Sequence, residues 1–322
     1  MKHKQRSQAR SPNYPLPTIH YPLLLLLFLA ISCRTTQHIP DTALLDTGYL
    51  PLDADASVYV TIDVVNARPV LDLMEIGAAD NRQFAQMLDM TRFAAAAYFT
   101  GSDRRFQVHA LGSYPAGRAK MALGANKNWK KRRSALSGEE YWYSAKNGLS
   151  VALEPQRAFA AVAAAGVNQE TPADPFYTKP GTKIPDGFAE FGRGAALAFW
   201  LENPGSIING KLQEMGLPLE IPAEQVFVSL FPEAESAADG TEAEYTAYIR
   251  IQTFSETQAR AFTGVLGFAR MLFPADAASG GAAMLMPLLF AHPPVQDGRN
   301  LTIKTNTMTA REIALLFSLF SL

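Results

Sequence analysis

Cysteine is almost absent from this sequence of 322 residues, because the only one is Cys33. No intrachain disulfide can form, so burial of apolar side chains and hydrogen bonds must hold the fold. Histidine is scarce too. Only His38, His109 and His292 follow Cys33, and no two of them stand at the spacing of metal ligands. The sequence therefore predicts no metal site and no bound cofactor.

The motifs of common catalytic sites are also missing. The sequence contains neither a Gly-x-Ser-x-Gly nucleophile turn nor a Gly-x-x-x-x-Gly-Lys-Ser/Thr phosphate loop. His109 lies in an alternating strand pattern, with no nucleophile or orienting acid in view. We interpret it as a surface or partly packed histidine rather than a general base. We expect no enzymatic activity.

The most informative stretch runs from Pro22 to Cys33. An unbroken apolar run, Leu23 to Ile31, is followed by the small residue Ser32 and by Cys33, and the leader before it carries Lys and Arg but no acidic residue. A basic leader, a short apolar core and a small residue at the end are typical of a secretory signal. The run is shorter than the about 20 residues that a membrane-spanning helix needs. We expect cleavage between Ser32 and Cys33.

The segment Leu29-Ala-Ile-Ser-Cys33 resembles the lipobox of bacterial lipoproteins, in the relaxed form of the spirochaetal variety, with Ala30 three places before the cysteine. The resemblance implies that Cys33 is acylated and that the signal is cut just before it. Covalent lipid on Cys33 would tether the chain to a membrane that it does not span. The alternatives are a plain N-terminal anchor and a secreted protein in which the cysteine is incidental.

The charge balance argues against nucleic acid as a partner. Residues 1–32 hold four of the 29 Lys and Arg and none of the 30 Asp and Glu, so the mature chain has 25 basic and 30 acidic residues. A mildly acidic exported protein is a poor nucleic-acid binder. Its apolar content of 48% is that of a globular protein.

Hydrophobic periodicity predicts an α+β fold, an antiparallel or mixed sheet covered by helices. Alternation predicts strands over residues 57–64, 105–113, 140–144, 149–153, 195–201, 225–231, 245–253 and 301–305. Helical spacing and composition predict helices over residues 67–76 with Asn66 as N-cap and Pro69 in the first turn, over 81–99, 115–126, 157–167, 204–215 and 309–320, and after Ser255. The turn Lys146-Asn-Gly148 predicts a hairpin.

The order of strand, helix and further strands recurs in both halves, which favours two similar α+β units. Residues 168–187, rich in Pro and Gly, form the expected linker or loop between them. We expect a signal peptide over 1–32, the acylated cysteine and a tether over 33–49, a first unit over 50–167 and a second unit over 188–322.

One dense charge cluster stands out, formed by Lys127, Trp129, Lys130, Lys131, Arg132 and Arg133. Basic residues beside an amphipathic Trp are suited to contact with anionic headgroups. The competing interpretation is a solvated loop next to the predicted hairpin.

Three stretches are more apolar than a soluble surface requires: Phe262–Phe273, Met284–Phe290 and Ile313–Leu322. Such segments are either deeply buried or in contact with lipid or a partner. In its signal, its size and the character of its helices, the chain resembles treponemal outer-membrane-associated lipoproteins. In outline, that family has an acylated α/β body with amphipathic helices that dip into the leaflet.

We therefore expect a non-enzymatic, membrane-anchored lipoprotein of the cell envelope, on the periplasmic or outer-membrane side. Its role would be structural or interactive, and lipid-contacting amphipathic helices are the sharper version of this hypothesis. The alternative is a carrier that binds a lipid or another apolar ligand in a cavity between sheet and helices. Expected partners are membrane lipid and other envelope proteins.

Overall fold

The computed structural model describes residues 56–74, 81–99, 105–146, 148–163, 172–176, 188–205, 209, 221–233, 242–272 and 291–319. The predicted signal, its cleavage site at Ser32 and Cys33, and the tether lie outside these residues. So do Met284–Phe290 and most of the predicted linker and of the predicted helix over 204–215.

The described chain contains runs of consecutive strands with helices between them. The strands are β1 (Ala56–Asp63), β2 (Thr91–Phe99), β3 (Arg105–Gly112), β4 (Trp129–Arg133), β5 (Glu140–Ser144), β6 (Leu149–Leu153), β7 (Arg157–Ala163), β8 (Leu197–Glu202), β9 (Ala223–Pro232), β10 (Glu244–Thr253), β11 (Val295–Asp297) and β12 (Asn300–Thr309). The helices are α3 (Val64–Leu73), α4 (Asn81–Met90), α5 (Ala116–Ala125), α6 (Phe188–Gly192), α8 (Glu256–Leu272) and α10 (Ala310–Leu319).

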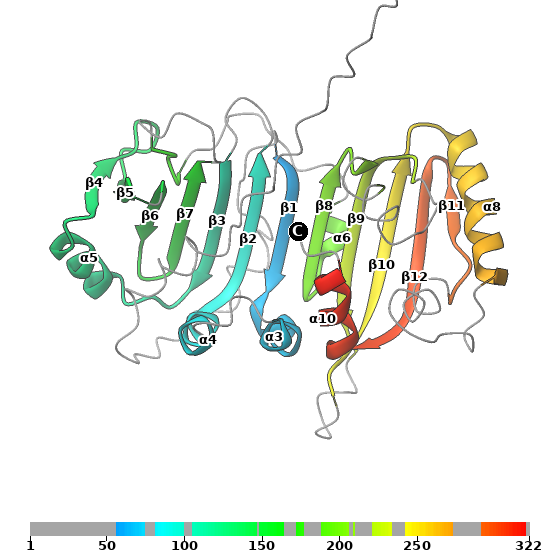
Figure 1. The fold of residues 1–322 in the computed structure, drawn as a ribbon, viewed down its shortest axis with the longest axis horizontal. Helices are drawn as coiled ribbons and strands as arrows, with labels where there is room; N and C mark the ends of the chain where they lie inside the picture. Colours follow the sequence, from blue (N-terminus) through cyan, green and yellow to red (C-terminus); the bar gives the residue numbers. More distant parts are fainter. Residues whose placement is uncertain are drawn as a thin grey trace, which may run out of the picture.

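All twelve described strands belong to one sheet, in the order β11-β12-β10-β9-β8-β1-β2-β3-β7-β6-β5-β4 (Figure 1). Every neighbouring pair is antiparallel. The predicted α+β class with an antiparallel sheet is confirmed. The sheet is long, with α5 and β4 at one end and α8 and β11 at the other.

The two halves of the chain meet at the β1–β8 pair in the middle of the sheet. From this pair outward, one side runs β1-β2-β3-β7-β6 and the other runs β8-β9-β10-β12-β11. On each side, three strands that are consecutive in the chain lie next to one another. The next two strands lie in reversed chain order, β7 then β6 on one side and β12 then β11 on the other. The first half then adds β5 and β4. Similar halves therefore share one continuous sheet and do not form two separate ones.

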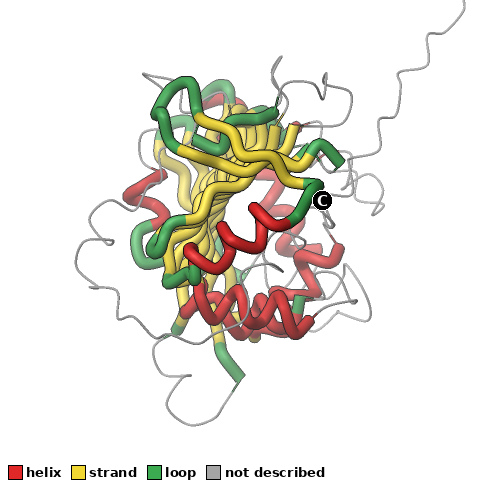
Figure 2. The backbone as a smooth tube through the Cα atoms, turned by 90° about the vertical axis from the view of Figure 1, so that its left-hand side faces the viewer, coloured by secondary structure: helices red, strands yellow, loops and turns green. Residues whose placement is uncertain are grey.

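Five of the helices pack on one face of the sheet. Directly paired residues of neighbouring strands point to the same face of a sheet. Ala160, beneath α5, is connected to Val228, beneath α8, by a continuous line of such pairs through Val108, Ala96, Val60 and Phe199. Helices α5 and α8 therefore cover the same face. Helices α3, α4 and α10 bury their apolar sides between these two points. Helix α6 covers the opposite face, where Phe188 contacts Tyr59. Figure 2 looks along the sheet from the α5–β4 end.

The predicted helix over residues 81–99 is wrong in its second part. Helix α4 ends at Met90, and residues 91–99 form β2 between β1 and β3. Alanine has the highest helix propensity, and the run Ala94–Ala97 lies inside the predicted helix. In the fold these small side chains lie in the centre of the sheet, where Ala95 and Ala97 are fully buried. Strand pairing therefore overrides the local preference.

The predicted helix over residues 157–167 is wrong for the same reason. Residues 157–163 form β7, which is paired on both sides with β3 and β6. The expected cap at Asn66 also shifts. Asp63 caps α3 instead, because its Oδ1 accepts hydrogen bonds from the backbone N–H groups of Val65 (3.1 Å) and Asn66 (3.3 Å).

Other local signals are confirmed. The hairpin between β5 and β6 forms, and Gly148 in its turn has a φ of 63°, which glycine adopts without strain. Ser255 caps α8 by accepting a hydrogen bond from the N–H of Gln258 (3.2 Å). Thr309 and Glu312 form a reciprocal capping box at the start of α10.

Candidate functional site

The described residues contain no group of three or more His, Cys, Asp or Glu side chains placed to hold a metal ion. In the same part of the chain, no helix combines the length and the apolar character that a bilayer crossing requires.

The sequence predicts a surface or partly packed histidine at position 109. In the structure, His109 lies on β3 and is deeply buried. Its Nε2 lies 3.2 Å from the carbonyl oxygen of Pro175, and its ring packs edge-on against Phe159. Burial is the main cause that lowers the pKa of His109 to about 4, and the hydrogen bond with Pro175 acts in the opposite direction. The imidazole is therefore neutral near pH 7, with Nε2–H donating to Pro175.

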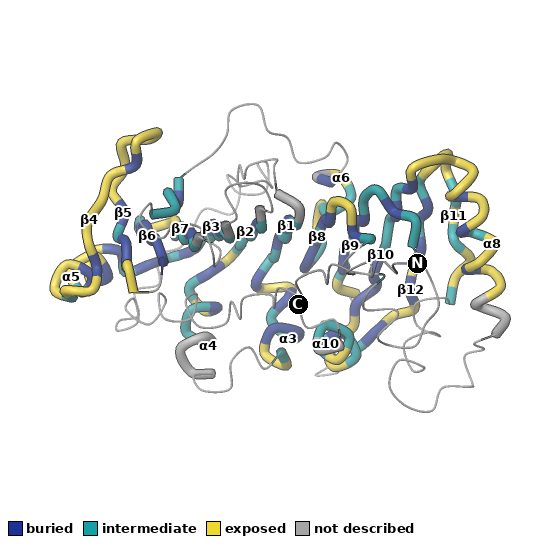
Figure 3. The backbone as a smooth tube through the Cα atoms, turned by 45° about the horizontal axis from the view of Figure 1, so that its top comes forward, coloured by how far each residue is buried: buried dark blue, intermediate teal, exposed yellow. Residues whose placement is uncertain are grey.

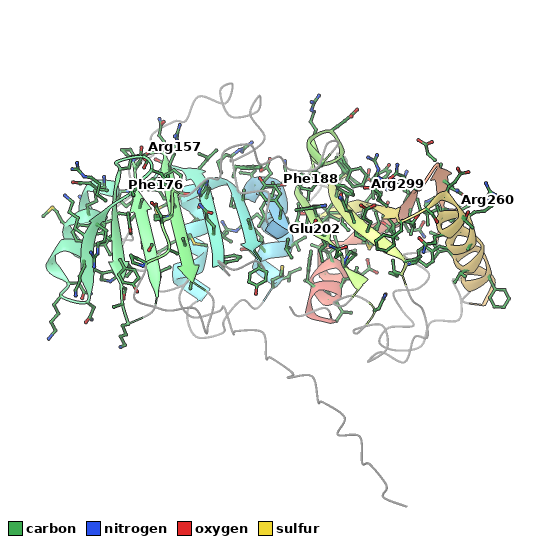
Figure 4. The ribbon with its side chains drawn as sticks, turned by 90° about the horizontal axis from the view of Figure 1, so that it is seen from above. Arg157, Phe176, Phe188, Glu202, Arg260 and Arg299 are labelled. Atoms are coloured by element: carbon green, nitrogen blue, oxygen red, sulfur yellow. The ribbon has the colours of Figure 1, made fainter. Side chains whose placement is uncertain are left out.

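The surroundings of His109 give it a structural role. Gln107 Nε2 also donates to the Pro175 carbonyl, at 2.8 Å, and Asp174 accepts a 2.6 Å hydrogen bond from Ser134 Oγ. Phe176 packs on Phe159, with ring centroids 4.9 Å apart (Figure 4). Together these contacts hold residues 172–176 against the face of the sheet opposite to α5.

The basic cluster forms a strand and not a solvated loop. Residues 129–133 are β4, which pairs with β5 and ends the sheet. Trp129 is only 7% exposed and packs with Ala119 and Leu123 beneath α5, so its indole belongs to the core. The four basic residues after it are all exposed. The sequence located the charge correctly, but Trp129 lies inside the fold.

The four basic side chains of β4 alternate between the two faces of the sheet. Lys131 and Arg133 share the α5 side and reach Glu140 Oε2 and Oε1 at 2.7 Å and 3.6 Å. Their hydrogen bonds and positive charges lower the pKa of Glu140, and the bond from Lys131 is the largest cause. Lys130 and Arg132 point to the other side, beside Tyr143 and Tyr141.

The structure adds two basic residues that the sequence interpretation missed. Arg118 and Lys120 lie on the outer side of α5, whose buried side carries Ala116, Ala119 and Leu123. Because α5 packs against β4, these side chains and the β4 cluster belong to the same end of the sheet. In the predicted helix over 115–126 both residues lie opposite the apolar side chains, and this spacing could have predicted that they are exposed.

The opposite end of the sheet is apolar. Helix α8 buries Ala259, Phe262 and Leu266 against β9, β10 and β12. Its far side carries Val265 and Phe268, which are 45% and 57% exposed. These two residues, with Ala261 and Gly264, follow the i, i+3, i+4, i+7 spacing of one helix face.

Two further exposed apolar residues belong to elements next to α8. Phe254, just before the helix, is 57% exposed, and Val295 on β11 is 67% exposed. Figure 3 shows the largely exposed α8 beside β11 at this end. By contrast, α10 buries Ile313 in the core and half-buries Leu316 and Phe317. Of the two apolar stretches, α8 therefore leaves large apolar side chains on its outer face, whereas α10 places most of its own against the core.

Comparison with known proteins shows the fold. No protein-family model matches the chain, and no curated protein matches it. Crystal form III of TP0453, a treponemal protein, is 17% identical, with a TM-score of 0.53 over 84% of this chain and 96% of that one. Crystal form I of TP0453 is 16% identical, with a TM-score of 0.51 over 84% and 98% of the two chains. The likeness covers both halves of the sheet.

Proposed function

We propose that the chain is a lipid-anchored, non-enzymatic protein of the cell envelope that also contacts the bilayer through the outer face of α8. The observation that carries this proposal is the exposed apolar face formed by Val265 and Phe268, with Phe254 just before the helix. Below, these three residues are called the apolar end. The lipobox resemblance at Cys33 supplies the anchor, and the shared fold with a treponemal protein is in keeping with this class.

The architecture of α8 fits a helix that lies in a membrane interface. Near its start, Glu256 and Arg260 form an exposed ion pair of 2.9 Å. The following turns present the apolar face to solvent while the opposite face is held by the sheet. Burying one such Val or Phe side chain in the acyl boundary contributes about 1–3 kcal/mol. The acyl anchor would keep the helix close to the surface.

The anchor is tested with Cys33→Ala in the complete chain. We expect the fold to be unchanged and the protein to leave the membrane fraction for the soluble fraction. Retention of the variant in the membrane fraction would show that acylation of Cys33 is not what holds it there.

The contact through α8 is tested by flotation of residues 34–322, which lack the anchor, with neutral vesicles. We expect the chain to float, and Val265→Ser with Phe268→Ser to reduce flotation roughly tenfold or more, because two apolar contacts are lost. The matched control is Val65→Ser with Leu73→Ser, two exposed apolar residues on α3. Equal loss in both variants, or no flotation of the original chain, would contradict the proposal.

A further inference from the structure

We propose that the other end of the sheet, formed by α5 and β4, binds the anionic headgroups of phospholipids. The surface consists of Arg118 and Lys120 on α5, Lys127 in the turn, and Lys130, Lys131, Arg132 and Arg133 on β4; it is called the basic end below. The inference rests on the membrane role proposed above, but it concerns a separate surface with different chemistry.

The basic end concentrates charge that the rest of the chain lacks. Residues 116–133 hold seven Lys and Arg and no Asp or Glu, whereas the whole chain has a formal charge of −1. All seven side chains are exposed. The carboxylates that follow are Glu139 and Glu140, and Glu140 is shared by Lys131 and Arg133. A net charge of +5 remains over residues 116–140, which is a strong local attraction for anions.

Protection of the sheet edge does not account for this arrangement. Charged residues on an edge strand prevent pairing with another chain, and the β4 residues serve that purpose. However, Arg118 and Lys120 lie on a helix and Lys127 lies in a turn, so none of the three guards the edge. Lys130 and Arg132 form no ion pair with any residue that the structure describes. The charges of these two residues are available to an external partner.

The geometry favours an extended anionic surface. The seven residues are distributed over helix α5, the turn after it and the edge strand β4 (Figure 1). Met121 and Leu136 lie among them, 77% and 61% exposed, and can enter the boundary below the headgroups. Phospholipid headgroups supply dense negative charge over such an area, and the anchor at Cys33 would hold the basic end within their reach.

The basic end and the apolar end are separate contacts. Eleven strand spacings of about 4.8 Å put the two edge strands about 50 Å apart along the sheet. Strand β1, into which the N-terminal part of the chain leads, lies between them. Contact at the apolar end depends on hydrophobic burial, whereas contact at the basic end depends on lipid charge and on salt.

The experiment isolates the basic end by fixing the protein on a neutral membrane. The mature chain, residues 33–322, is coupled through Cys33, its only cysteine, to a maleimide lipid in phosphatidylcholine vesicles, so that biological acylation is not required. Fluorescent target vesicles with or without phosphatidylglycerol are then added, and captured targets are measured by co-sedimentation. We expect much more capture of anionic than of neutral targets, because the apolar end alone can contact the neutral ones. This excess should be lost between 0.1 M and 1 M salt, where the Debye length falls from about 10 Å to about 3 Å.

Two charge-reversal variants test the residues. Lys130→Glu with Arg132→Glu should lower capture at least tenfold, because each basic residue near an anionic leaflet contributes roughly fivefold. Lys120→Glu with Lys127→Glu, away from the strand, should act in the same direction. The matched control, Arg157→Glu with Arg193→Glu, makes the same change in net charge at exposed sites outside the basic end and should leave capture unchanged.

The inference is overturned if anionic targets are not captured, if neutral targets are captured equally well, or if the control variant loses as much capture as the others. Failure of the α8 contact is distinguishable. In that case Val265→Ser with Phe268→Ser would leave neutral flotation unchanged, while the capture of anionic vesicles would still depend on the basic end.

Discussion

The two ends of the sheet use the same packing but present opposite surfaces. Helix α5 buries Ala116, Ala119 and Leu123, and α8 buries Ala259, Phe262 and Leu266, both on the same face of the sheet. Outside, α5 and its neighbour β4 carry seven basic residues, whereas α8 presents Val265 and Phe268. The side of a helix that packs is constrained by the fold, and the outer side is free to acquire a function. Similar halves can therefore have different surfaces.

The largest expected effect on stability comes from comparing a buried residue and an exposed residue of the basic end. Trp129→Ala removes a buried indole beneath α5 and should lower the free energy of unfolding by about 3–5 kcal/mol. Lys130→Ala, one residue along the same strand but exposed, should change it by less than about 0.5 kcal/mol. Urea denaturation measures both. A loss below about 1 kcal/mol for Trp129→Ala would show that the indole is not needed to hold α5 on the sheet.

The second prediction compares how a histidine in each half affects the dependence of the free energy of unfolding on pH. His109 in the first half has a pKa of about 4 when folded and an ordinary value near 6.5 when unfolded. Between these values the unfolded chain binds the extra proton, so the free energy of unfolding falls as the pH drops from 6.5 to 4. The fall is about 3 kcal/mol, with no further loss from this group below pH 4.

His109→Gln removes this titration and keeps a donor for Pro175, so its stability should depend less on pH between 6.5 and 4. His292→Gln, at an exposed histidine of the second half, should keep the dependence of the original chain. Urea denaturation at a series of pH values gives both profiles. Identical slopes for His109→Gln and the original chain would disprove the assignment.

The smallest expected effect concerns how the two end helices begin. Ser255 caps α8, while α5 begins after Pro115 with no side-chain cap. Ser255→Ala should therefore cost about 1 kcal/mol, and Ser255→Thr should retain most of the stability, because a Thr hydroxyl can accept the same hydrogen bond. The midpoint of thermal unfolding compares the variants. Equal losses for Ala and Thr would point to a steric rather than a capping effect.

Local sequence signals predicted much of the fold. The alternation in 245–253, the turn at Gly148 and the cap at Ser255 each depend on neighbours in the chain, and each is confirmed. The predictions failed at alanine-rich segments. Residues 91–99 and 157–163 have helix-forming composition, yet both are strands, because each is paired on both sides, with an adjacent hairpin strand on one side and a strand distant in the sequence on the other.

For the candidate sites, the sequence alone determined the charge at Lys127–Arg133, the apolar character of Phe262–Phe273 and the lone cysteine at the end of the apolar run. These properties depend only on which residues are present and in what order. The tertiary structure decided that Trp129 is buried, that α5 adds Arg118 and Lys120 to the charge, and that Val265 and Phe268 remain outside. Exposure is settled by packing between distant segments, which local sequence does not encode.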